Sequence, residues 1–180
     1  KWIDISENGY GISVLNNCKY GCDIHNGEIG LTMLKSAVYP NPDADKEHHS
    51  FTWSIAPHEG GWREGNTVAK AYVLNNPYQT AVKENEGGNL PASYSFVQAD
   101  KENVVIEAVK KAEDSDAVIV RLYECYNRRG QTTLTFPRPV KRAVICNMLE
   151  EEIGEVLNVN GSQVELELKP YEIETVKVEF

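Results

Sequence analysis

The sequence predicts an all-β protein built from antiparallel β-sandwich domains. Val and Ile together number 29, whereas Leu and Met together number 13. Side chains that branch at Cβ fit the pleated surface of a sheet better than a helix. In addition, short segments of alternating apolar and polar residues are separated by Gly, Asn, Asp and Pro, which form turns. Both observations favour strands over helices along most of the chain.

The second half of the chain shows this pattern more clearly. Residues 104–109 and 117–123 predict a hairpin around the turn residues Asp114–Asp116. A helix over 103–113 is the competing interpretation, because the Glu and Lys residues there tolerate a helix. Asn160-Gly161 marks a second hairpin. Further strands are predicted at 131–136, 142–149, 155–159, 163–168 and 172–179. This number of short strands predicts a small antiparallel sandwich.

The first half also predicts strands, but too few for two complete sheets. They lie at 2–6, 11–16, 28–35, 50–56 and 68–74. Asn26-Gly27 marks a turn between two of them. We therefore expect the end of a larger β-domain whose earlier strands lie upstream of residue 1. The polar, Gly-containing stretch 83–91 predicts a linker or long loop, so we place the domains at 1–85 and 86–180.

Composition excludes several classes of function. Eighteen Lys and Arg against 27 Asp and Glu give a formal charge of -9, which disfavours binding to the phosphate backbone of nucleic acids. No apolar run approaches the ~20 residues that span a bilayer. Four cysteines give no dense disulfide framework for a chain of this length. We therefore expect a reduced, cytoplasmic protein that binds neither nucleic acid nor membrane.

Two groups of residues have the chemistry of metal ligands. Cys18 and Cys22 lie near His25, which resembles half of a zinc site, but no second pair follows closely. His48 and His49 follow the acidic residues Asp43, Asp45 and Glu47 in a Pro-containing loop. A solvated acidic loop is the favoured interpretation, and a secondary cation site is the alternative. We predict no metal site and no catalytic residue in this chain, since none of the common catalytic motifs is present.

Basic residues gather in the second half of the chain. Such a patch can bind an anion or a partner, but in an acidic chain a set of surface salt bridges is the commoner explanation. The residues are Arg128, Arg129, Arg138, Lys141 and Arg142.

Several blocks of sequence resemble the glycoside hydrolase family 38 α-mannosidases, in their bacterial, fungal and cytosolic branch. The resemblance extends in order along nearly the whole chain. The blocks are residues 2–11, 15–21, 31–36, 39–45, 51–53, 57–58, 74–77, 109–114, 121–124, 147–150 and 168–173. The most specific of them contains Asn16-Asn17-Cys18-Lys19-Tyr20-Gly21.

The resemblance implies that this chain is the last portion of a larger enzyme. Residues 1–85 would be the end of a large β-supersandwich domain, and residues 86–180 a small terminal sandwich. The family's catalytic acids and its His/Asp zinc site lie in an N-terminal domain, so we expect this chain alone to be inactive and to hold no cofactor. The parent is expected to hydrolyse α-mannosides with retention and to require zinc. The partner of this chain would be that missing catalytic domain, and a homo-oligomer is a further possibility.

The resemblance also suggests which residues lie near the substrate or the domain interface. In the family, the strand matching Leu31–Lys35 and its following loop face the catalytic domain. Relatives usually have Arg where this chain has Lys35, and Lys offers only a point charge in place of a planar fork. The block with Asn16, Lys19 and Tyr20 is expected at the same interface.

Two other functions remain open from the sequence. One is an independent sandwich module that binds carbohydrate or protein through exposed aromatic side chains, for which Trp2, Trp53 and Trp62 are candidates. The other is a purely structural fragment without a ligand.

Overall fold

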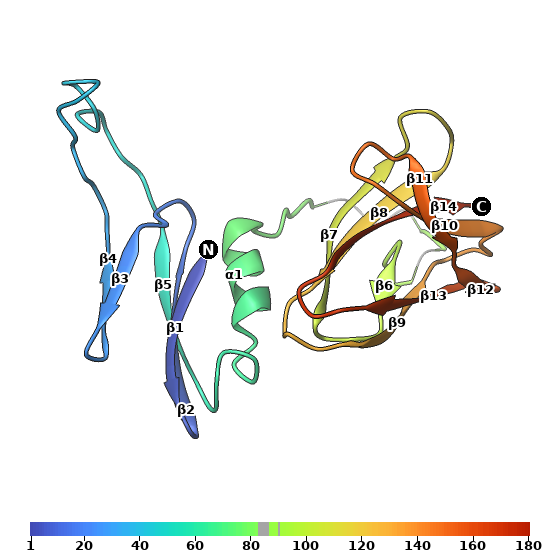
Figure 1. Cartoon of the computed structure of the whole chain (residues 1–180), viewed down its shortest axis with the longest axis horizontal. Coiled ribbons are helices and arrows are strands. Elements are labelled where there is room, and N and C mark those ends of the chain that lie inside the picture. The colour runs from blue at the N-terminus through green and yellow to red at the C-terminus, as the bar shows by residue number, and fades with distance from the viewer. Residues whose placement is uncertain (83–86, 90) are drawn as a thin grey trace. The chain divides into compact units, whose positions relative to one another are not determined.

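The computed structural model describes residues 1–82, 87–89 and 91–180 (Figure 1). The chain forms two compact units, Lys1–Glu84 and Asn85–Phe180, which we call the first unit and the terminal unit. Residues 83–86 and 90 of the predicted linker lie outside the described residues. Both units consist mainly of antiparallel strands, so the prediction of an all-β fold is confirmed.

The first unit is built on a three-stranded antiparallel sheet. Its strands are β1 (Trp2–Glu7), β2 (Tyr10–Asn16) and β5 (Trp53–His58), in the order β1-β2-β5. The predicted strands 2–6 and 11–16 are confirmed, and the predicted strand 50–56 begins and ends later. Ser13 and Leu15 of β2 are buried, whereas the alternate side chains are partly exposed. The two faces of this sheet therefore have different surroundings.

A helix, α1 (Thr67–Asn75), covers the buried face of the sheet. The prediction of a strand at 68–74 was therefore wrong. Thr67, Val68 and Ala71 are the buried residues of this segment, and their i, i+1, i+4 spacing is that of a helix face. The β-branched residues suggested a strand, but packing on the sheet decides the structure. Asn76, the C-cap residue, and Pro77 follow the helix.

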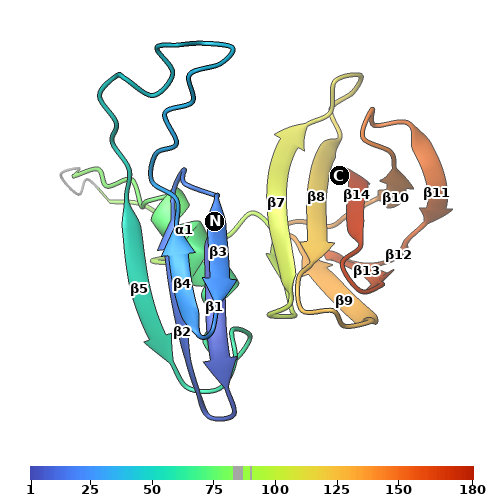
Figure 2. The same cartoon turned by 60° about the vertical axis from the view of Figure 1, so that its left-hand side comes forward.

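A two-stranded hairpin and a long loop complete the first unit. β3 (Cys22–His25) pairs with β4 (Glu28–Leu31), and the connecting residues Asn26 and Gly27 both have positive φ, as a type I′ turn requires. The predicted strand 28–35 is thus shorter than expected. Residues 32–52, which we call the long loop, connect β4 to β5 and extend away from the sheet in both views (Figures 1 and 2).

The terminal unit has one sheet of order β11-β10-β14-β8-β7 and one of order β12-β13-β9-β6 (Figure 2). Every pairing in both sheets is antiparallel. The strands are β6 (Gln98–Ala99), β7 (Val104–Lys111), β8 (Val118–Glu124), β9 (Gly130–Thr135), β10 (Arg142–Cys146), β11 (Glu152–Val156), β12 (Asn158–Asn160), β13 (Gln163–Leu168) and β14 (Ile173–Glu179).

Most predicted strands of this unit are confirmed, and two of them differ in extent. The hairpin of β7 and β8 forms, so the alternative of a helix at 103–113 is wrong. The strand predicted at 142–149 ends at Cys146, because Asn147–Glu150 forms a turn in which Glu150 has positive φ. The single strand predicted at 155–159 is divided between β11 and β12, which belong to different sheets. Element boundaries are therefore less certain from sequence than the elements themselves.

The predicted hairpin at Asn160-Gly161 is confirmed with a shift of one residue. Asn160 pairs with Gln163, so the two connecting residues are Gly161 and Ser162. Gly161 has a φ of 60°, which a glycine at the first position of such a turn adopts without strain.

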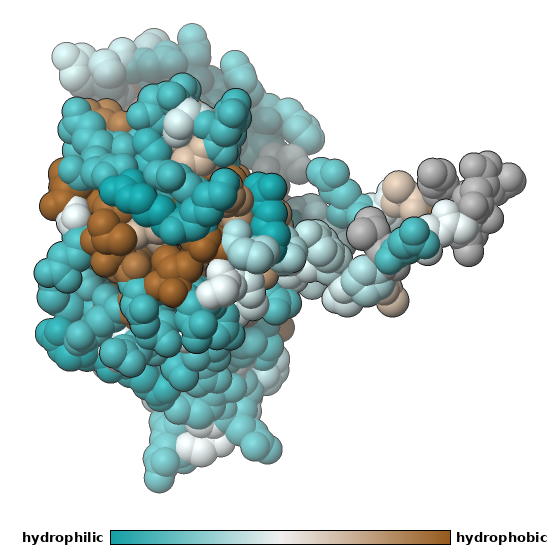
Figure 3. All heavy atoms as spheres, turned by 90° about the vertical axis from the view of Figure 1, so that its right-hand side faces the viewer, coloured by the Kyte–Doolittle hydropathy of each residue, from teal (hydrophilic) through white to brown (hydrophobic). Residues whose placement is uncertain are grey.

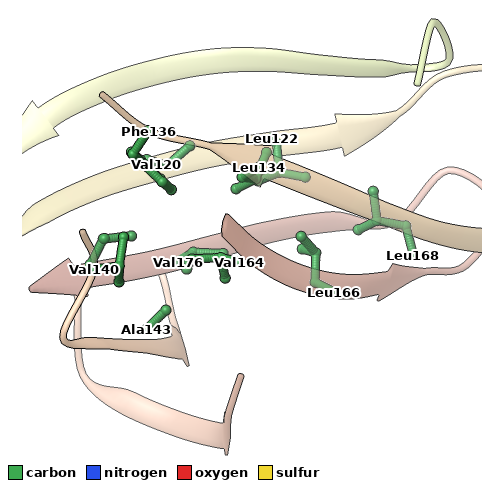
Figure 4. Close-up of a cluster of buried hydrophobic side chains, with 11 residues drawn as sticks. Val120, Leu122, Leu134, Phe136, Val140, Ala143, Val164, Leu166, Leu168 and Val176 are labelled. Atoms are coloured by element: carbon green, nitrogen blue, oxygen red, sulfur yellow. The ribbon is translucent and has the colours of Figure 1, made fainter. Parts of the chain in front are cut away.

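The core of the terminal unit lies between the two sheets (Figure 4). In β13 the buried residues Val164, Leu166 and Leu168 alternate with exposed polar ones. Leu134 of β9 and Val120 of β8 pack against the same cluster and are fully buried. Burial of such side chains contributes about 1.5–3 kcal/mol each relative to exposure, so this cluster accounts for much of the unit's stability.

The surface of the terminal unit also carries apolar side chains. Met148, Leu149, Ile153 and Val156 lie in or just before β11 and are largely exposed. Figure 3 shows hydrophobic atoms gathered in one patch, surrounded by hydrophilic ones, on the side that faces right in Figure 1. No helix among the described residues is long and apolar enough to cross a membrane.

We predict that Leu134→Ala destabilises the chain by about 2–5 kcal/mol, because it removes buried methyl groups and leaves a cavity in the sandwich core. The matched control is Ile153→Ala, since Ile153 is 67% exposed; it should change stability by less than about 0.5 kcal/mol. Urea unfolding followed by far-UV circular dichroism measures both. Equal effects of the two substitutions would contradict the assigned core.

Candidate functional site

Asn16, one of the predicted interface residues, is buried at the end of β2. Its Oδ1 accepts the backbone N–H of Lys19 at 2.9 Å, and its carbonyl oxygen accepts Nδ2–H of Asn75 from α1 at 3.1 Å. The side-chain amide of Asn16 therefore stabilises the following turn, and the backbone carbonyl of Asn16 connects that turn to the helix.

Lys19 and Tyr20 fold back onto neighbouring residues. The Lys19 ammonium lies 5.4 Å from the centre of the Phe51 ring, and the Tyr20 hydroxyl donates to the carbonyl of Asn17 at 3.0 Å. Asn17, which was not among the predicted site residues, exchanges two hydrogen bonds with Thr52, of 2.9 and 3.1 Å. Asn17 therefore fixes the end of the long loop beside this turn.

Asp45 organises the beginning of the long loop. Its Oδ2 accepts the backbone N–H of Ser36 at 3.0 Å and, more weakly, that of Lys35 at 3.4 Å. Hydrogen bonds from these two N–H groups lower the pKa of Asp45, slight burial opposes them, and the charges of His49 and Lys19 lower it further. The charge of Lys19 and the backbone N–H of Lys35 thus both stabilise the ionised carboxylate of Asp45. Sequence reasoning missed this role because the bonded amides lie nine and ten residues away.

The two sequence groups with metal-ligand chemistry do not form a cluster. Within residues 1–82, 87–89 and 91–180, no three His, Cys, Asp or Glu side chains could hold a metal ion. Cys18 and Cys22 are exposed free thiols. In the acidic loop, Nε2 of His49 lies 3.1 Å from the carbonyl oxygen of Asp45, and Lys46 pairs with Asp43 at 2.8 Å.

A buried polar cluster between the sheet and α1 was not expected from the sequence. Asp4 of β1 accepts Oγ–H of Ser13 at 2.6 Å and the Nε2 of His58 at 2.7 Å. Ser13 also shares a hydrogen bond of 2.6 Å with Thr67. Only 4% of the Asp4 side chain and 3% of the His58 side chain are exposed. The cluster therefore links β1, β2, β5 and α1 away from solvent.

Although these residues include Ser, His and Asp, their order differs from that of a catalytic triad. A triad places the His between the Ser and the Asp. Here the Asp4 carboxylate lies between Ser13 and His58 and accepts from both. The burial and this connectivity indicate a structural role.

Two glycines make room for the His58 ring. A Cβ atom on Gly11 of β2 or on Gly65, just before α1, would overlap the ring. The imidazole therefore occupies a slot between two backbone segments, and its position opposite Gly11 follows from the pairing of β2 with β5.

The other face of the first unit's sheet is apolar and open. The strand register aligns Ile3, Val14 and Ile55 in one row across the sheet, and Ile5, Ile12 and Pro57 in the next. Tyr10, Trp53 and Ile55 are about half exposed.

The β3–β4 hairpin lies over part of this face. It encloses an apolar hollow of about 340 Å³ between Gly27 and Ile29 of the hairpin and Ile5, Tyr10 and Ile12 of the sheet. We call the exposed row and this hollow together the open face.

Comparison with known proteins assigns both units to one family. The model described as "Glycosyl hydrolases family 38 C-terminal domain" matches residues 1–43, and the one described as "Glycosyl hydrolases family 38 C-terminal beta sandwich domain" matches residues 103–176. This chain belongs to glycosyl hydrolase family 38. The resemblance found in the sequence blocks is confirmed, and the chain corresponds to the C-terminal domains of the family's α-mannosidases.

Curated α-mannosidases are similar along nearly the whole chain. "Alpha-mannosidase G" of Dictyostelium discoideum is 34% identical over 98% of the chain, "Alpha-mannosidase 2C1" of Homo sapiens 30% over 96%, and "Alpha-mannosidase" of Saccharomyces cerevisiae 27% over 100%. The chain spans only 17–18% of the length of these relatives.

A solved structure supports the fold. The crystal structure of a family 38 glycosyl hydrolase from Enterococcus faecalis matches 98% of this chain and 22% of its own chain, with a TM-score of 0.76 and 18% identity.

We predict that the first unit loses stability as the pH falls below the ordinary Asp4 pKa of 3.8. Burial raises the pKa of Asp4, but hydrogen bonds from Ser13, His58 and Ser6 outweigh it, and the folded pKa lies lower. A carboxylate whose pKa is lower in the folded than in the unfolded chain stabilises the fold at any pH above its unfolded pKa. This contribution is lost as the pH falls through the pKa of the folded state.

Tryptophan fluorescence can follow this loss, because all three Trp residues lie in the first unit. Unfolding between about pH 7 and pH 3 should show a smaller pH dependence in Asp4→Asn than in the unchanged chain. Asp43→Asn on the exposed loop is the control and should keep the full dependence. An Asp4→Asn profile parallel to that of the unchanged chain would contradict the role of this carboxylate.

Proposed function

We propose that this chain is the non-catalytic C-terminal part of a retaining, zinc-dependent, cytoplasmic α-mannosidase, and that it supports the catalytic domain of that enzyme. The assignment of both units to family 38 and the mannosidase names of the relatives support the activity of the parent. The small share of those relatives that the chain spans supports a parent several times longer. The four cysteines are free thiols, which suits a reducing compartment.

The open face is the observation that supports the scaffolding role. An apolar sheet face requires a covering layer, and α1 covers only the opposite face, which holds the buried polar cluster around Asp4. The rows through Val14 and Ile12 continue across all three strands without a charged side chain. A second layer supplied by the parent would bury Tyr10, Trp53 and Ile55, each about half exposed here. The same face could join two copies of the chain when that layer is missing.

The residues that the structure describes do not fit a zinc centre. The described residues contain no cluster of three His, Cys, Asp or Glu side chains that could hold a metal ion. The Ser, His and Asp residues around Asp4 are buried and therefore not accessible to a substrate. Both the metal and the pair of carboxylates that retaining hydrolysis needs would come from the rest of the parent.

The alternative of a sugar-binding module receives less support. Stacking on a sugar needs an exposed aromatic ring. Trp2 and Trp62 stack on each other with ring centres 5.1 Å apart, and Arg63 covers the Trp62 ring at 4.2 Å. Trp53 lies on the open face, where the proposed covering layer would contact it.

The isolated chain is expected to show no turnover of 4-nitrophenyl α-mannoside, with or without added zinc, because in this proposal the zinc and the catalytic carboxylates belong to the rest of the parent. Release of nitrophenol measured by absorbance tests this expectation. Zinc-dependent turnover by the purified chain would overturn the assignment of a non-catalytic role.

A charge on the open face is expected to destabilise the full-length parent but not the isolated chain. In the parent, Ile55→Lys would bury an unpaired ammonium, at a cost of several kcal/mol, and should lower both the melting temperature and the amount of active enzyme. In the isolated chain Ile55 is 56% exposed, and the same change should shift stability by no more than about 0.5 kcal/mol.

Val73→Lys provides the matched control, since Val73 is 48% exposed but lies on α1, outside the open face. It should be tolerated in both proteins. A parent in which Ile55→Lys and Val73→Lys behave alike would show that the open face is not an interface.

A further inference from the structure

A polar pocket lies at one end of the terminal unit, among the ends of strands from both of its sheets. It is formed where β8 ends and where β7 and β9 begin, and its volume is about 210 Å³. A buried water needs only ~15 Å³, so this pocket has room for a small molecule of several atoms. Its polar lining consists of Lys101, Asn103, Glu124, Arg128, Arg129, Gln131 and Thr132.

Glu124 builds the inner wall of this pocket. The residue is 1% exposed, and its carboxylate accepts Nδ2–H of Asn103 at 2.9 Å and the backbone N–H groups of Tyr126 at 2.7 Å and Tyr171 at 3.0 Å. Burial raises the pKa of Glu124, but these bonds and one from the backbone of Arg128 outweigh it and lower the pKa. The carboxylate is therefore ionised and fully engaged with the protein.

The bonds to Glu124 hold three loops in place. Asn103 precedes β7, Tyr126 and Arg128 follow β8, and Tyr171 precedes β14. Two of these loops carry the cationic residues Lys101, Arg128 and Arg129 to the pocket, so Glu124 anchors the backbone from which these side chains extend.

Three cationic side chains, Lys101, Arg128 and Arg129, line the pocket against one carboxylate, which gives the lining a formal charge of +2 in a chain of charge -9. The acidic partners of all three cations lie outside this lining, and Lys101 pairs with Asp100 at 3.1 Å. Arg128 is 3.7 Å from Glu102 and Arg129 is 3.5 Å from Glu167. Both distances exceed those of ordinary N–H···O bonds, about 2.7–3.2 Å, and all four side chains are exposed.

The other basic residues that the sequence grouped with these two arginines are engaged elsewhere. Arg142 pairs with Glu152 at 2.5 Å and with Glu179 at 3.2 Å. Arg138 stacks on the ring of Phe180 at 4.1 Å, beyond the opposite end of β9. The structure thus divides the basic cluster and leaves Arg128 and Arg129 beside a pocket.

We propose that this pocket binds a phosphate group, carried by inorganic phosphate or by a sugar phosphate. A phosphate monoester has a charge between -1.5 and -2 and three terminal oxygens, which matches three cationic donors around one pocket. The planar guanidinium groups bind phosphate through paired N–H donors, and Lys101 adds a point charge. Gln131 and Asn103 provide polar neighbours for the remainder of the ligand. A ligand with a single carboxylate has one negative charge and two oxygens, so it would pair with only some of these three cationic side chains.

The proposal is tested on the whole 180-residue chain by a titration followed in ¹⁵N–¹H spectra at low ionic strength and about pH 7.5, where phosphate is mainly dianionic. Inorganic phosphate should give saturable shifts of the Gly130 and Gln131 amides. Mannose 6-phosphate forms the second arm: tighter saturation than with inorganic phosphate identifies a sugar phosphate, and equal or weaker saturation identifies the free ion. Acetate at matched ionic strength and neutral mannose should leave these amides unchanged.

Arg128→Gln/Arg129→Gln should weaken binding by at least about tenfold, because charge-assisted hydrogen bonds are lost. Lys101→Gln, a milder second variant, should weaken it by about threefold or more. The control Arg138→Gln should stay within about twofold, because Arg138 lies beyond the other end of β9. Shifts that do not saturate, equal shifts with acetate, or an equal loss in Arg138→Gln would overturn the proposal.

Discussion

The covering of sheet faces is the physical constraint on which this chain depends. An apolar sheet face exposed to water loses the hydrophobic contribution of about 25 cal/mol per Å² that a covering layer supplies. In the terminal unit, two sheets cover each other, and Leu134, Val164 and Val176 are fully buried between them. In the first unit, α1 covers one face, while the row through Ile3, Val14 and Ile55 remains open. The terminal unit is thus complete by this criterion, and the first unit requires a further layer.

Buried carboxylates have a second organising role in both units. Asp4 joins three strands and a helix through Ser13 and His58, and Glu124 joins three loops through backbone N–H groups. In each case hydrogen bonds to the charged form outweigh the cost of burial, so the pKa is lowered. The same strategy has different consequences. Asp4 holds a sheet to its helix, whereas Glu124 positions the cations of a pocket.

Most of the fold could be predicted from the sequence, because strand alternation is a local signal. Gln163–Leu168 alternates strictly, and its predicted bounds agree with the structure. The helix at Thr67–Asn75 could not be predicted by the same rule, since Val68, Tyr72 and Val73 have high strand propensity and only packing on the sheet reveals the helical face. The strand end at Cys146 depends on the turn that follows it, and the strand end at Val156 depends on the chain crossing from one sheet to the other. The alternation of apolar and polar residues contains no signal for either.

The candidate sites were harder to predict, because they depend on contacts between distant residues. Asn16, Lys19, Tyr20 and Lys35 were chosen by resemblance, and their relation to a substrate remains a prediction. Asp45, which connects the backbone of Lys35 with the charge of Lys19, gives no local signal. The pocket beside Arg128 and Arg129 requires knowledge of which ends of β7, β8 and β9 meet.

The slot around His58 has a consequence for how this sequence can change. Gly11 and Gly65 are far apart in the chain, yet each is required by the same ring. A side chain at either position would displace the imidazole and deprive the buried Asp4 carboxylate of its hydrogen bond with His58. A small residue in place of His58 would empty the slot and remove that partner directly. The three positions are therefore coupled by packing, and a substitution at one disturbs the environment of the other two.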